Sequence, residues 1–91
     1  MIKVYSKPLC GYCDMAKQWL TKHEIEFEEI RVDTNQEARQ FLLDQGHKMI
    51  PQIYFNGKLL VEGGGQALVR MDPNQIKKLV GEIKDVDNIQ L

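Results

Sequence analysis

The order of strand-like and helix-like segments constrains the fold of this chain more than any other feature of its sequence. Short apolar segments typical of strands alternate with segments in which apolar residues recur every three or four positions, the spacing of a buried helix face. The predicted elements are strand 2–6, helix 11–22, strand 25–33, helix 35–45, strands 52–55 and 58–61, a helical turn at 66–71 and a last helix from 73. The first strand, helix and strand predict a parallel pair with a right-handed crossover.

The dipeptide Asn56-Gly57 determines how the later strands pair. Both residues tolerate the positive φ of a two-residue turn, so strands 52–55 and 58–61 should form an antiparallel hairpin. Together with the parallel pair, this hairpin predicts an α/β fold of order β-α-β-α-β-β-α. Its sheet should be mixed and four-stranded, with helices packed against it.

Helix-start signals support this order. Thr34 with Glu37 three residues later is a capping box, which predicts Thr34 as the cap of the second helix. Asp72 followed by Pro73 predicts the start of the last helix, because proline is tolerated at the first helical position. The predicted buried face of that helix consists of Ile76, Leu79, Val80 and Ile83.

Length and charge exclude several classes of function. The 91 residues fit one domain, 1–91. With 12 basic and 13 acidic residues the net charge is −1, which gives no electrostatic reason to expect nucleic acid or a membrane surface as partner. The first residues lack the apolar core of a signal peptide, and no apolar run approaches the ~20 residues that span a bilayer. We expect a cytoplasmic protein that is a monomer.

Cys10 and Cys13 are the only cysteines, and the predicted chemistry depends on them. A bond between them closes almost no loop and would stabilise the fold little, whereas a close pair in a reducing compartment is more often catalytic or metal-binding. Cys10 falls at a helix start, where free N–H groups and the macrodipole favour the reactive thiolate. Lys7 could add positive charge. Cys13, one turn further, is the candidate resolving thiol for a mixed disulfide on Cys10.

Two other interpretations of the cysteines stay open on the sequence alone. Both could be small core residues, although Gly11-Tyr12 between them is a poor core segment. A zinc site needs about four ligands, for which His23 and His47 are the natural partners. Neither histidine has finger-like spacing, so we predict no metal ligand.

Residues 49–52 and 63–65 form two further candidate site segments. Pro51 leads into the third predicted strand, where its missing N–H removes no ladder bond. A cis bond after Ile50 would turn the chain sharply and expose the Ile50 backbone to an extended peptide, and a plain trans proline is the alternative. The three glycines 63–65 either let a ligand approach the backbone beside a helix start or form a glycine-rich turn.

Together these segments resemble the dithiol glutaredoxin family over nearly the whole chain. The matching residues are Lys7-Pro8-Leu9-Cys10-Gly11-Tyr12-Cys13, Met49-Ile50-Pro51-Gln52 and Gly63-Gly64-Gly65, in that order. The resemblance implies a thioredoxin-like fold, a cis bond before Pro51, and a thiol–disulfide oxidoreductase that reduces protein disulfides and glutathione mixed disulfides. It also implies glutathione as co-substrate, no tightly bound cofactor, and disulfide-containing client proteins, with ribonucleotide reductase as one client.

The resemblance further implies roles for single residues. Cys10 matches the nucleophile that carries glutathione, and Cys13 matches the resolving thiol. The implied glutathione-binding residues are Lys7, Tyr12, Gln52, Ile50 through its backbone, the neighbouring Pro51, and Gly64, Gly65 and Gln66 for the γ-glutamyl carboxylate.

Two departures from the family pattern keep other functions open. Gly11 stands where many members have proline, and members without that proline sometimes hold a [2Fe–2S] cluster between two subunits with glutathione. Gln66 and Ala67 stand where members usually have acidic residues that meet the amino group of glutathione. The alternatives are therefore a thioredoxin-like reductase fed by a flavoprotein, and a [2Fe–2S] carrier.

Overall fold

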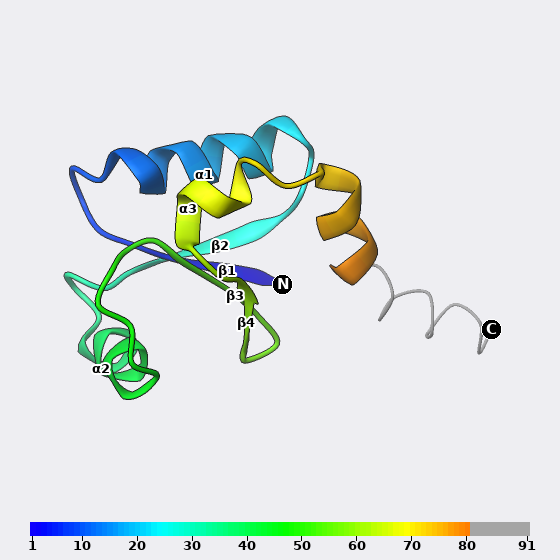
Figure 1. The fold of residues 1–91 in the computed structure, drawn as a ribbon. Coiled ribbons are helices and arrows are strands. Elements are labelled where there is room, and N and C mark those ends of the chain that lie inside the picture. The colour runs from blue at the N-terminus through cyan, green and yellow to red at the C-terminus, as the bar shows by residue number, and fades with distance from the viewer. Residues whose placement is uncertain (81–91) are drawn as a thin grey trace.

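The computed structural model describes residues 1–80 and contains the predicted elements in the predicted order (Figure 1). The elements are β1 (Ile2–Ser6), α1 (Gly11–Lys22), β2 (Phe27–Arg31), α2 (Gln36–Asp44), β3 (Gln52–Phe55), β4 (Lys58–Val61) and α3 (Gly64–Leu68), and residues 73–80 are also helical. Two elements differ clearly from the prediction: α3 begins within the glycine run instead of at 66, and β2 is shorter at both ends.

The four strands form one mixed sheet in the order β2-β1-β3-β4. β1 runs parallel to β2 and antiparallel to β3, and β3 pairs antiparallel with β4. Asn56 and Gly57 have φ angles of 53° and 79°, which confirms the predicted hairpin turn. In Figure 1, α1 and α3 lie on one face of the sheet and α2 lies on the other.

β2 is shorter than the predicted strand 25–33. Ile25 is buried, but its N–H donates to the Leu20 carbonyl at 2.9 Å, so it belongs to the turn that leaves α1. Val32 still donates to the Ser6 carbonyl at 2.9 Å, although it lies beyond the end of the strand. The segment is therefore a five-residue strand. Ile25 and Val32, which flank it, pack into the two core clusters from outside the strand.

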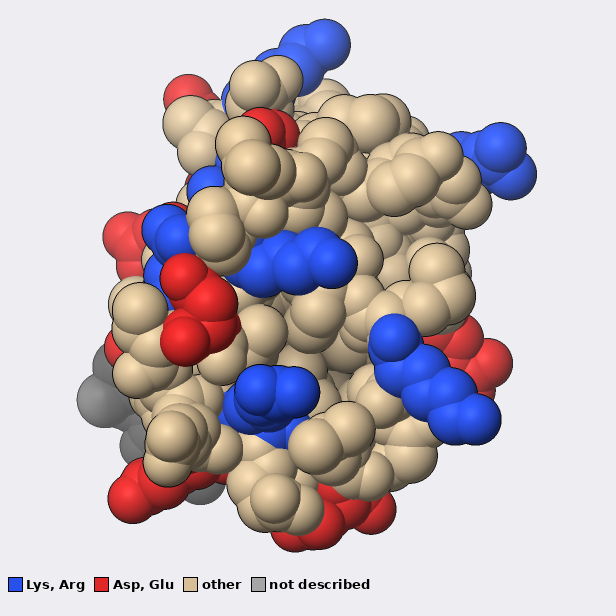
Figure 2. All heavy atoms as spheres, turned by 90° about the vertical axis from the view of Figure 1, so that its left-hand side faces the viewer, with Lys and Arg blue, Asp and Glu red and all other residues tan. Residues whose placement is uncertain are grey.

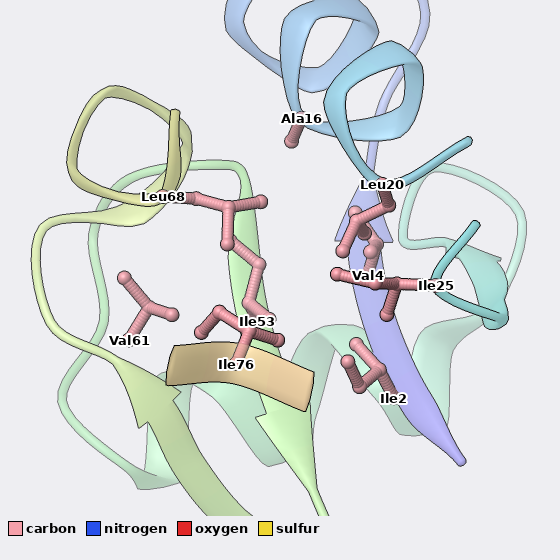
Figure 3. Close-up of a cluster of buried hydrophobic side chains, with 9 residues drawn as sticks. All are labelled: Ile2, Val4, Ala16, Leu20, Ile25, Ile53, Val61, Leu68 and Ile76. Atoms are coloured by element: carbon pink, nitrogen blue, oxygen red, sulfur yellow. The ribbon is translucent and has the colours of Figure 1, made fainter. Parts of the chain in front are cut away.

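Side-chain alternation along β1 divides the core between the two faces of the sheet. Ile2 and Val4 are fully buried on the α1 side, together with Leu20, whereas Tyr5 is buried on the α2 side. Figure 3 shows the larger cluster, which consists of Ile2, Val4, Ala16, Leu20, Ile25, Ile53, Val61, Leu68 and Ile76. Burying one such aliphatic side chain contributes roughly 1.5–3 kcal/mol, so this cluster secures α1 and α3 on the sheet.

The predicted cap of α2 is wrong by one residue. Asn35 is the cap, because its Oδ1 accepts a hydrogen bond from the Ala38 N–H at 3.0 Å. The Thr34 hydroxyl instead donates to the Arg31 carbonyl at 3.5 Å. Asparagine and threonine both cap helices well, so the capping box alone could not decide between these neighbours.

The last helix begins as predicted, but its buried face is narrower. The Asp72 Oδ1 accepts from the Asn74 N–H at 2.9 Å, and Ile76 is fully buried. Leu79 is 42% exposed and not buried as expected, because the face centred on Ile76 meets the core. The prediction for Ile83 lies outside the described residues.

Candidate active site

The loop after β1 places Cys10 at the N-terminus of α1, as predicted. Leu9 has a φ of 55° and Cys10 an extended backbone (φ −116°, ψ 106°), so the chain reverses before the helix begins. Cys10 is the N-cap: its carbonyl accepts from the Asp14 N–H at 3.1 Å, and its Sγ accepts from the Cys13 N–H at 3.2 Å. The sulfur occupies the place of a capping oxygen, where an amide donor and the helix dipole stabilise negative charge.

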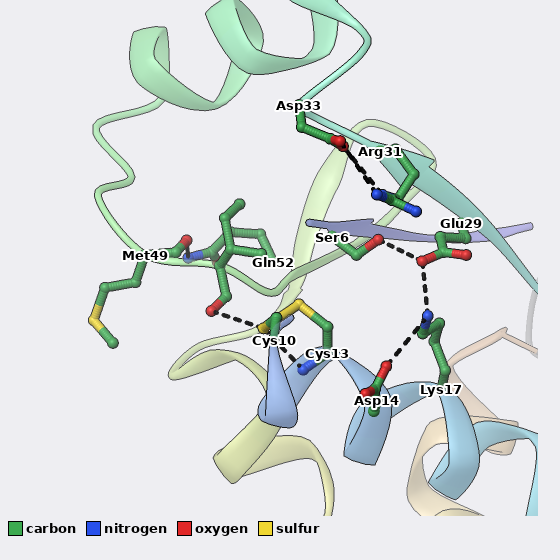
Figure 4. The surroundings of a disulfide bond; sticks show 11 residues. Ser6, Cys10, Cys13, Asp14, Lys17, Glu29, Arg31, Asp33, Met49 and Gln52 are labelled. Carbon is green, nitrogen blue, oxygen red and sulfur yellow. Dashed lines mark hydrogen bonds and ion pairs between the residues drawn. A yellow bond between two sulfur atoms is a disulfide. The ribbon is translucent and has the colours of Figure 1, made fainter. Parts of the chain in front are cut away.

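The two sulfurs differ in access. Cys13 is fully buried, whereas Cys10 retains 9% exposure. In this structure they form a disulfide, with the Cα atoms 5.2 Å apart (Figure 4). A group arriving from outside therefore meets Cys10 first, which fits its predicted role as nucleophile.

The loop at 49–52 faces Cys10. The Ile50–Pro51 bond is cis, as the family resemblance implied, and the Ile50 carbonyl oxygen lies 3.9 Å from the Cys10 Sγ. Gln52 is buried, and its Nε2 donates to the Met49 carbonyl at 2.9 Å. The Gln52 side chain therefore stabilises the loop from within, and the Ile50 carbonyl lies beside the Cys10 sulfur.

Gly64 and Gly65 allow α3 to pack directly against the loop at Pro51 and the first turn of α1. A Cβ added at Gly64 would lie 2.6 Å from the Pro51 carbonyl oxygen, and one added at Gly65 would lie 2.6 Å from the Tyr12 carbonyl oxygen. Gly64 also has a φ of +67°, which disfavours other residues. The structure thus bears out part of the glycine-rich turn that was the alternative, because Gly63 lies in a turn with a φ of +94°, while Gly64 and Gly65 pack closely at the helix start.

Seven of the eight residues that the resemblance assigned to glutathione line one cavity of about 140 Å³. They are Tyr12, Ile50, Pro51, Gln52, Gly64, Gly65 and Gln66. Lys7 lines a separate hollow of about 320 Å³ with Arg39 and Lys48, which we call the basic groove. Met49 and Ile50 border both hollows, so the two share a wall beside Cys10.

A polar network beneath α1 was missed by the sequence analysis. The fully buried Ser6 donates its hydroxyl to the Glu29 Oε2 at 2.6 Å, and the Lys17 Nζ donates to the same oxygen at 2.8 Å (Figure 4). The hydrogen bond from Lys17, followed by that from Ser6, holds the pKa of the Glu29 carboxyl below its ordinary value. The sequence did contain a signal, because Ser6 shares the buried phase of Ile2 and Val4 along β1.

The two histidines take part in other contacts. The His47 Nε2 lies 2.6 Å from the Tyr54 hydroxyl, and the His23 ring packs edge-on to Trp19. Within residues 1–80, no group of three or more His, Cys, Asp or Glu side chains is placed to hold a metal ion. Over the same stretch, none of the helices combines the length and apolar character needed to cross a bilayer.

Comparisons with known proteins agree with this geometry. Residues 2–60 match the family model for Glutaredoxin. The chain is 42% identical over 53 residues to the glutaredoxin-like protein NrdH of Lactococcus lactis subsp. lactis. The aligned segment covers 58% of this chain and 74% of that protein. The chain is also 29% identical over 72 residues to glutaredoxin 3 of Escherichia coli K12, and this alignment covers 78% of this chain and 84% of that protein.

A solved structure shows the same fold. The glutaredoxin-like NrdH-redoxin from Escherichia coli matches with a TM-score of 0.61 at 23% identity, over 86% of this chain and 92% of that one. This likeness confirms the thioredoxin-like fold. The family match extends from β1 to β4 and includes both cysteines and the cis-proline loop that faces them. The chain therefore belongs to the glutaredoxin family, whose members are thiol–disulfide oxidoreductases.

Proposed function

We propose that this chain reduces protein disulfides and glutathione mixed disulfides by thiol–disulfide exchange, with Cys10 as nucleophile and Cys13 as the resolving thiol that protein disulfides require. The supporting observation is the Cys13 N–H, which donates to the Cys10 Sγ at 3.2 Å. This donor and the N-terminus of α1 favour the thiolate form of Cys10 over the thiol. Burial acts in the opposite sense on Cys13, because an apolar environment disfavours a thiolate.

The proposed reaction has two exchange steps. The Cys10 thiolate attacks one sulfur of the client disulfide, so a Cys10–client bond forms, the client S–S bond breaks and one client thiolate leaves. Cys13 then loses its proton and attacks the Cys10 Sγ, which forms the Cys10–Cys13 disulfide and releases the second client thiolate. The client gains two electrons and the cysteine pair loses two, so a reductant must return two electrons for the next cycle.

Glutathione is the reductant that the cavity beside α3 supports. The Ile50 backbone lines this cavity and lies next to the Cys10 Sγ, where a tripeptide joined to that sulfur must extend. A first glutathione thiolate would open the Cys10–Cys13 bond and form a Cys10–glutathione mixed disulfide. A second would release glutathione disulfide and restore both thiols.

The same cavity also favours a second candidate, a thioredoxin-like reductase fed by a flavoprotein. Gln66 and Ala67 stand where the family usually places acidic side chains, so these two positions offer no carboxylate to the amino group of glutathione. The E. coli NrdH-redoxin, which shares the fold, has a thioredoxin-like activity profile. A reductase fed by protein–protein contact would not need the missing carboxylates.

Two coupled assays separate these candidates. One supplies glutathione, glutathione reductase and NADPH, and the other supplies thioredoxin reductase and NADPH, each with a disulfide protein as substrate. Turnover in the first assay supports glutathione as reductant, and turnover in the second alone supports the flavoprotein route. If chemically reduced protein cannot reduce any disulfide in a single turnover, the proposed function is wrong.

Variants of the two cysteines test their roles. Cys10→Ser should be inactive on every substrate, because the attacking sulfur is gone. Cys13→Ser should keep activity on small glutathione mixed disulfides, which need one thiol, and lose it on protein disulfides. Full activity of Cys10→Ser would overturn the assignment.

The remaining family-implied properties follow from the same proposal. We place the protein in the reducing cytoplasm and propose ribonucleotide reductase as one client, tested by turnover of the oxidised enzyme. A [2Fe–2S] cluster shared between two subunits with glutathione would take one cysteine sulfur from each, and Cys10, the more exposed of the two cysteines, is the residue that would supply it. Iron bound to anaerobically purified protein would favour the carrier alternative instead.

A further inference from the structure

The basic groove lies beside the reactive sulfur. Ile50, whose carbonyl oxygen is 3.9 Å from the Cys10 Sγ, lines it, and so do Arg39 and Leu43 of α2. Its volume of about 320 Å³ exceeds the 140 Å³ of the cavity beside α3. A polypeptide joined through its own cysteine to Cys10 would therefore meet the groove with the residues next to that cysteine.

Positive charge predominates in the groove. Lys7, Arg39 and Lys48 are exposed, and none of them forms an ion pair within residues 1–80. The acidic lining residue, Asp33, accepts two hydrogen bonds from the Arg31 guanidinium, at 3.0 and 3.2 Å, so its charge is already compensated. In Figure 2, which shows this side of the molecule, Lys and Arg side chains border the central hollow.

The local charge contrasts with that of the whole chain, whose net charge is −1. The groove is therefore not one part of a generally basic surface. Clustered cations of this kind raise the local concentration of an acidic partner and speed its association.

Apolar side chains accompany these cations. Leu42 is buried in the lining, while Leu43 and Met49 remain 53% and 74% exposed. Leu9, next to Cys10 in the chain, is fully exposed. Large exposed apolar side chains beside a charged groove are typical of a surface that contacts another protein.

We propose that the basic groove binds an acidic segment of the client protein, adjacent to the cysteine that Cys10 attacks. The inference rests on the proposed reductase function and adds the class of client. The segment carries two or more Asp or Glu side chains close to its disulfide, which approach Lys7, Arg39 and Lys48. It also carries an apolar side chain that packs on Leu43 and Met49.

A protein segment fits this surface better than a small free anion does. The three cations belong to three parts of the chain: the loop after β1, α2 and the loop before β3. A small anion would contact one or two of them and leave the apolar side chains uncovered, whereas an extended segment can contact both kinds of side chain at once.

Two matched disulfide peptides test the proposal. Both carry the same intramolecular disulfide and apolar residues, but one has three Glu residues beside its cysteine and the other has Gln at those places. Reduced protein is mixed with each peptide in a single turnover, so no reductant enters the measurement. The acidic peptide should be reduced about tenfold faster at low salt, and this preference should vanish in about 0.5 M salt, where exposed charges are screened.

Charge-removing variants assign the preference to the groove. Arg39→Gln and Lys48→Gln should each lower the rate for the acidic peptide by about two- to fivefold, the range of a single exposed charge pair, and leave the Gln peptide unchanged. Lys58→Gln is the matched control, because Lys58 is an exposed lysine on β4 that lines neither hollow. It should change neither rate.

The outcomes separate this proposal from the proposed function. Equal rates for the two peptides would overturn the acidic-client proposal and leave the reductase function standing. Reduction of neither peptide would contradict the reductase function itself. If Arg39→Gln weakens turnover with glutathione but not the preference for the acidic peptide, the groove binds a glutathione carboxylate and the proposal is wrong.

Discussion

At the scale of single residues, Gly65 lies too close to the backbone of the first turn of α1 for a side chain to fit. A Cβ there would be 2.6 Å from the Tyr12 carbonyl oxygen and 3.0 Å from the Pro51 Cγ. Gly65→Ala should therefore push α3 away from the active site. We expect the free energy of unfolding, measured by urea denaturation, to fall by about 1–3 kcal/mol, as for other overpacked sites.

Gly11→Ala provides the matched control, because nothing lies within 4 Å of a Cβ at that position and Gly11 is the first residue of α1. This variant should be as stable as the wild type, or more stable by up to about 1 kcal/mol through helix propensity. Equal stability of Gly65→Ala and Gly11→Ala would show that α3 does not pack against the Tyr12 backbone as described.

The predictability of the site depends on whether a residue follows a local rule. Cys10 at a helix start and a proline at a strand start can be read from their neighbours, and the structure places both as expected. The packing of Gly65 against Tyr12 could not be predicted, because it depends on how α3 approaches the start of α1, some 50 positions away in the chain. Arg39 was missed for the same reason: an exposed arginine has no special pattern until α2 is placed beside the groove.

At the scale of elements, one carboxylate connects three of them. Glu29 on β2 accepts hydrogen bonds from Lys17 on α1 and Ser6 on β1. These hydrogen bonds lower the pKa of Glu29 from its ordinary 4.5 in the folded state. The resulting stabilisation is complete above the unfolded-state pKa and is lost as the pH falls through the lower, folded-state pKa.

We therefore expect the free energy of unfolding of Glu29→Gln to lie below that of the wild type at pH 7. The difference should be about 1 kcal/mol or less, because the pair is partly exposed to solvent. It should shrink as the pH falls below the ordinary pKa of 4.5, and it should be lost once the pH passes the lower, folded-state pKa, where the folded-state carboxylate becomes protonated. Urea denaturation at several pH values measures this, with the exposed Glu26→Gln as control. A difference that stays constant from pH 7 to pH 3 would contradict this account.

The order of elements was predictable, because helical and alternating periodicities and the Asn56-Gly57 turn are local properties of the sequence. Element ends were less so. Ile25 was wrongly assigned to a strand, because an apolar residue buried in a turn looks the same in the sequence as one buried in a sheet. The start of α3 at Gly64 was missed because consecutive glycines normally disfavour a helix, and only the tight packing at this site explains them.

At the scale of the whole molecule, the sheet positions the site and the disulfide adds little to the stability of the fold. β1 lies inside the sheet between β2 and β3, and the loop that follows it leads to Cys10. The larger core cluster, from Ile2 to Ile76, does not include either cysteine. The fold should therefore persist when the disulfide is opened.

Reduction of the Cys10–Cys13 bond should lower the free energy of unfolding by about 2 kcal/mol or less, because a bond between residues so close in sequence restricts the unfolded chain little. The far-ultraviolet circular dichroism spectrum should not change. Urea denaturation with and without reductant measures the difference. Loss of secondary structure on reduction would show instead that the bond has a structural role.

Both cysteines of the chain belong to the opening turn of α1, including its cap. The reduced and oxidised forms of the cysteine pair thus differ in covalent structure only between residues 10 and 13. A protein that has to distinguish the two forms, such as an upstream electron donor, must contact residues 10–13 directly. Surfaces remote from these residues, such as the β3–β4 hairpin, have the same covalent structure in both redox states.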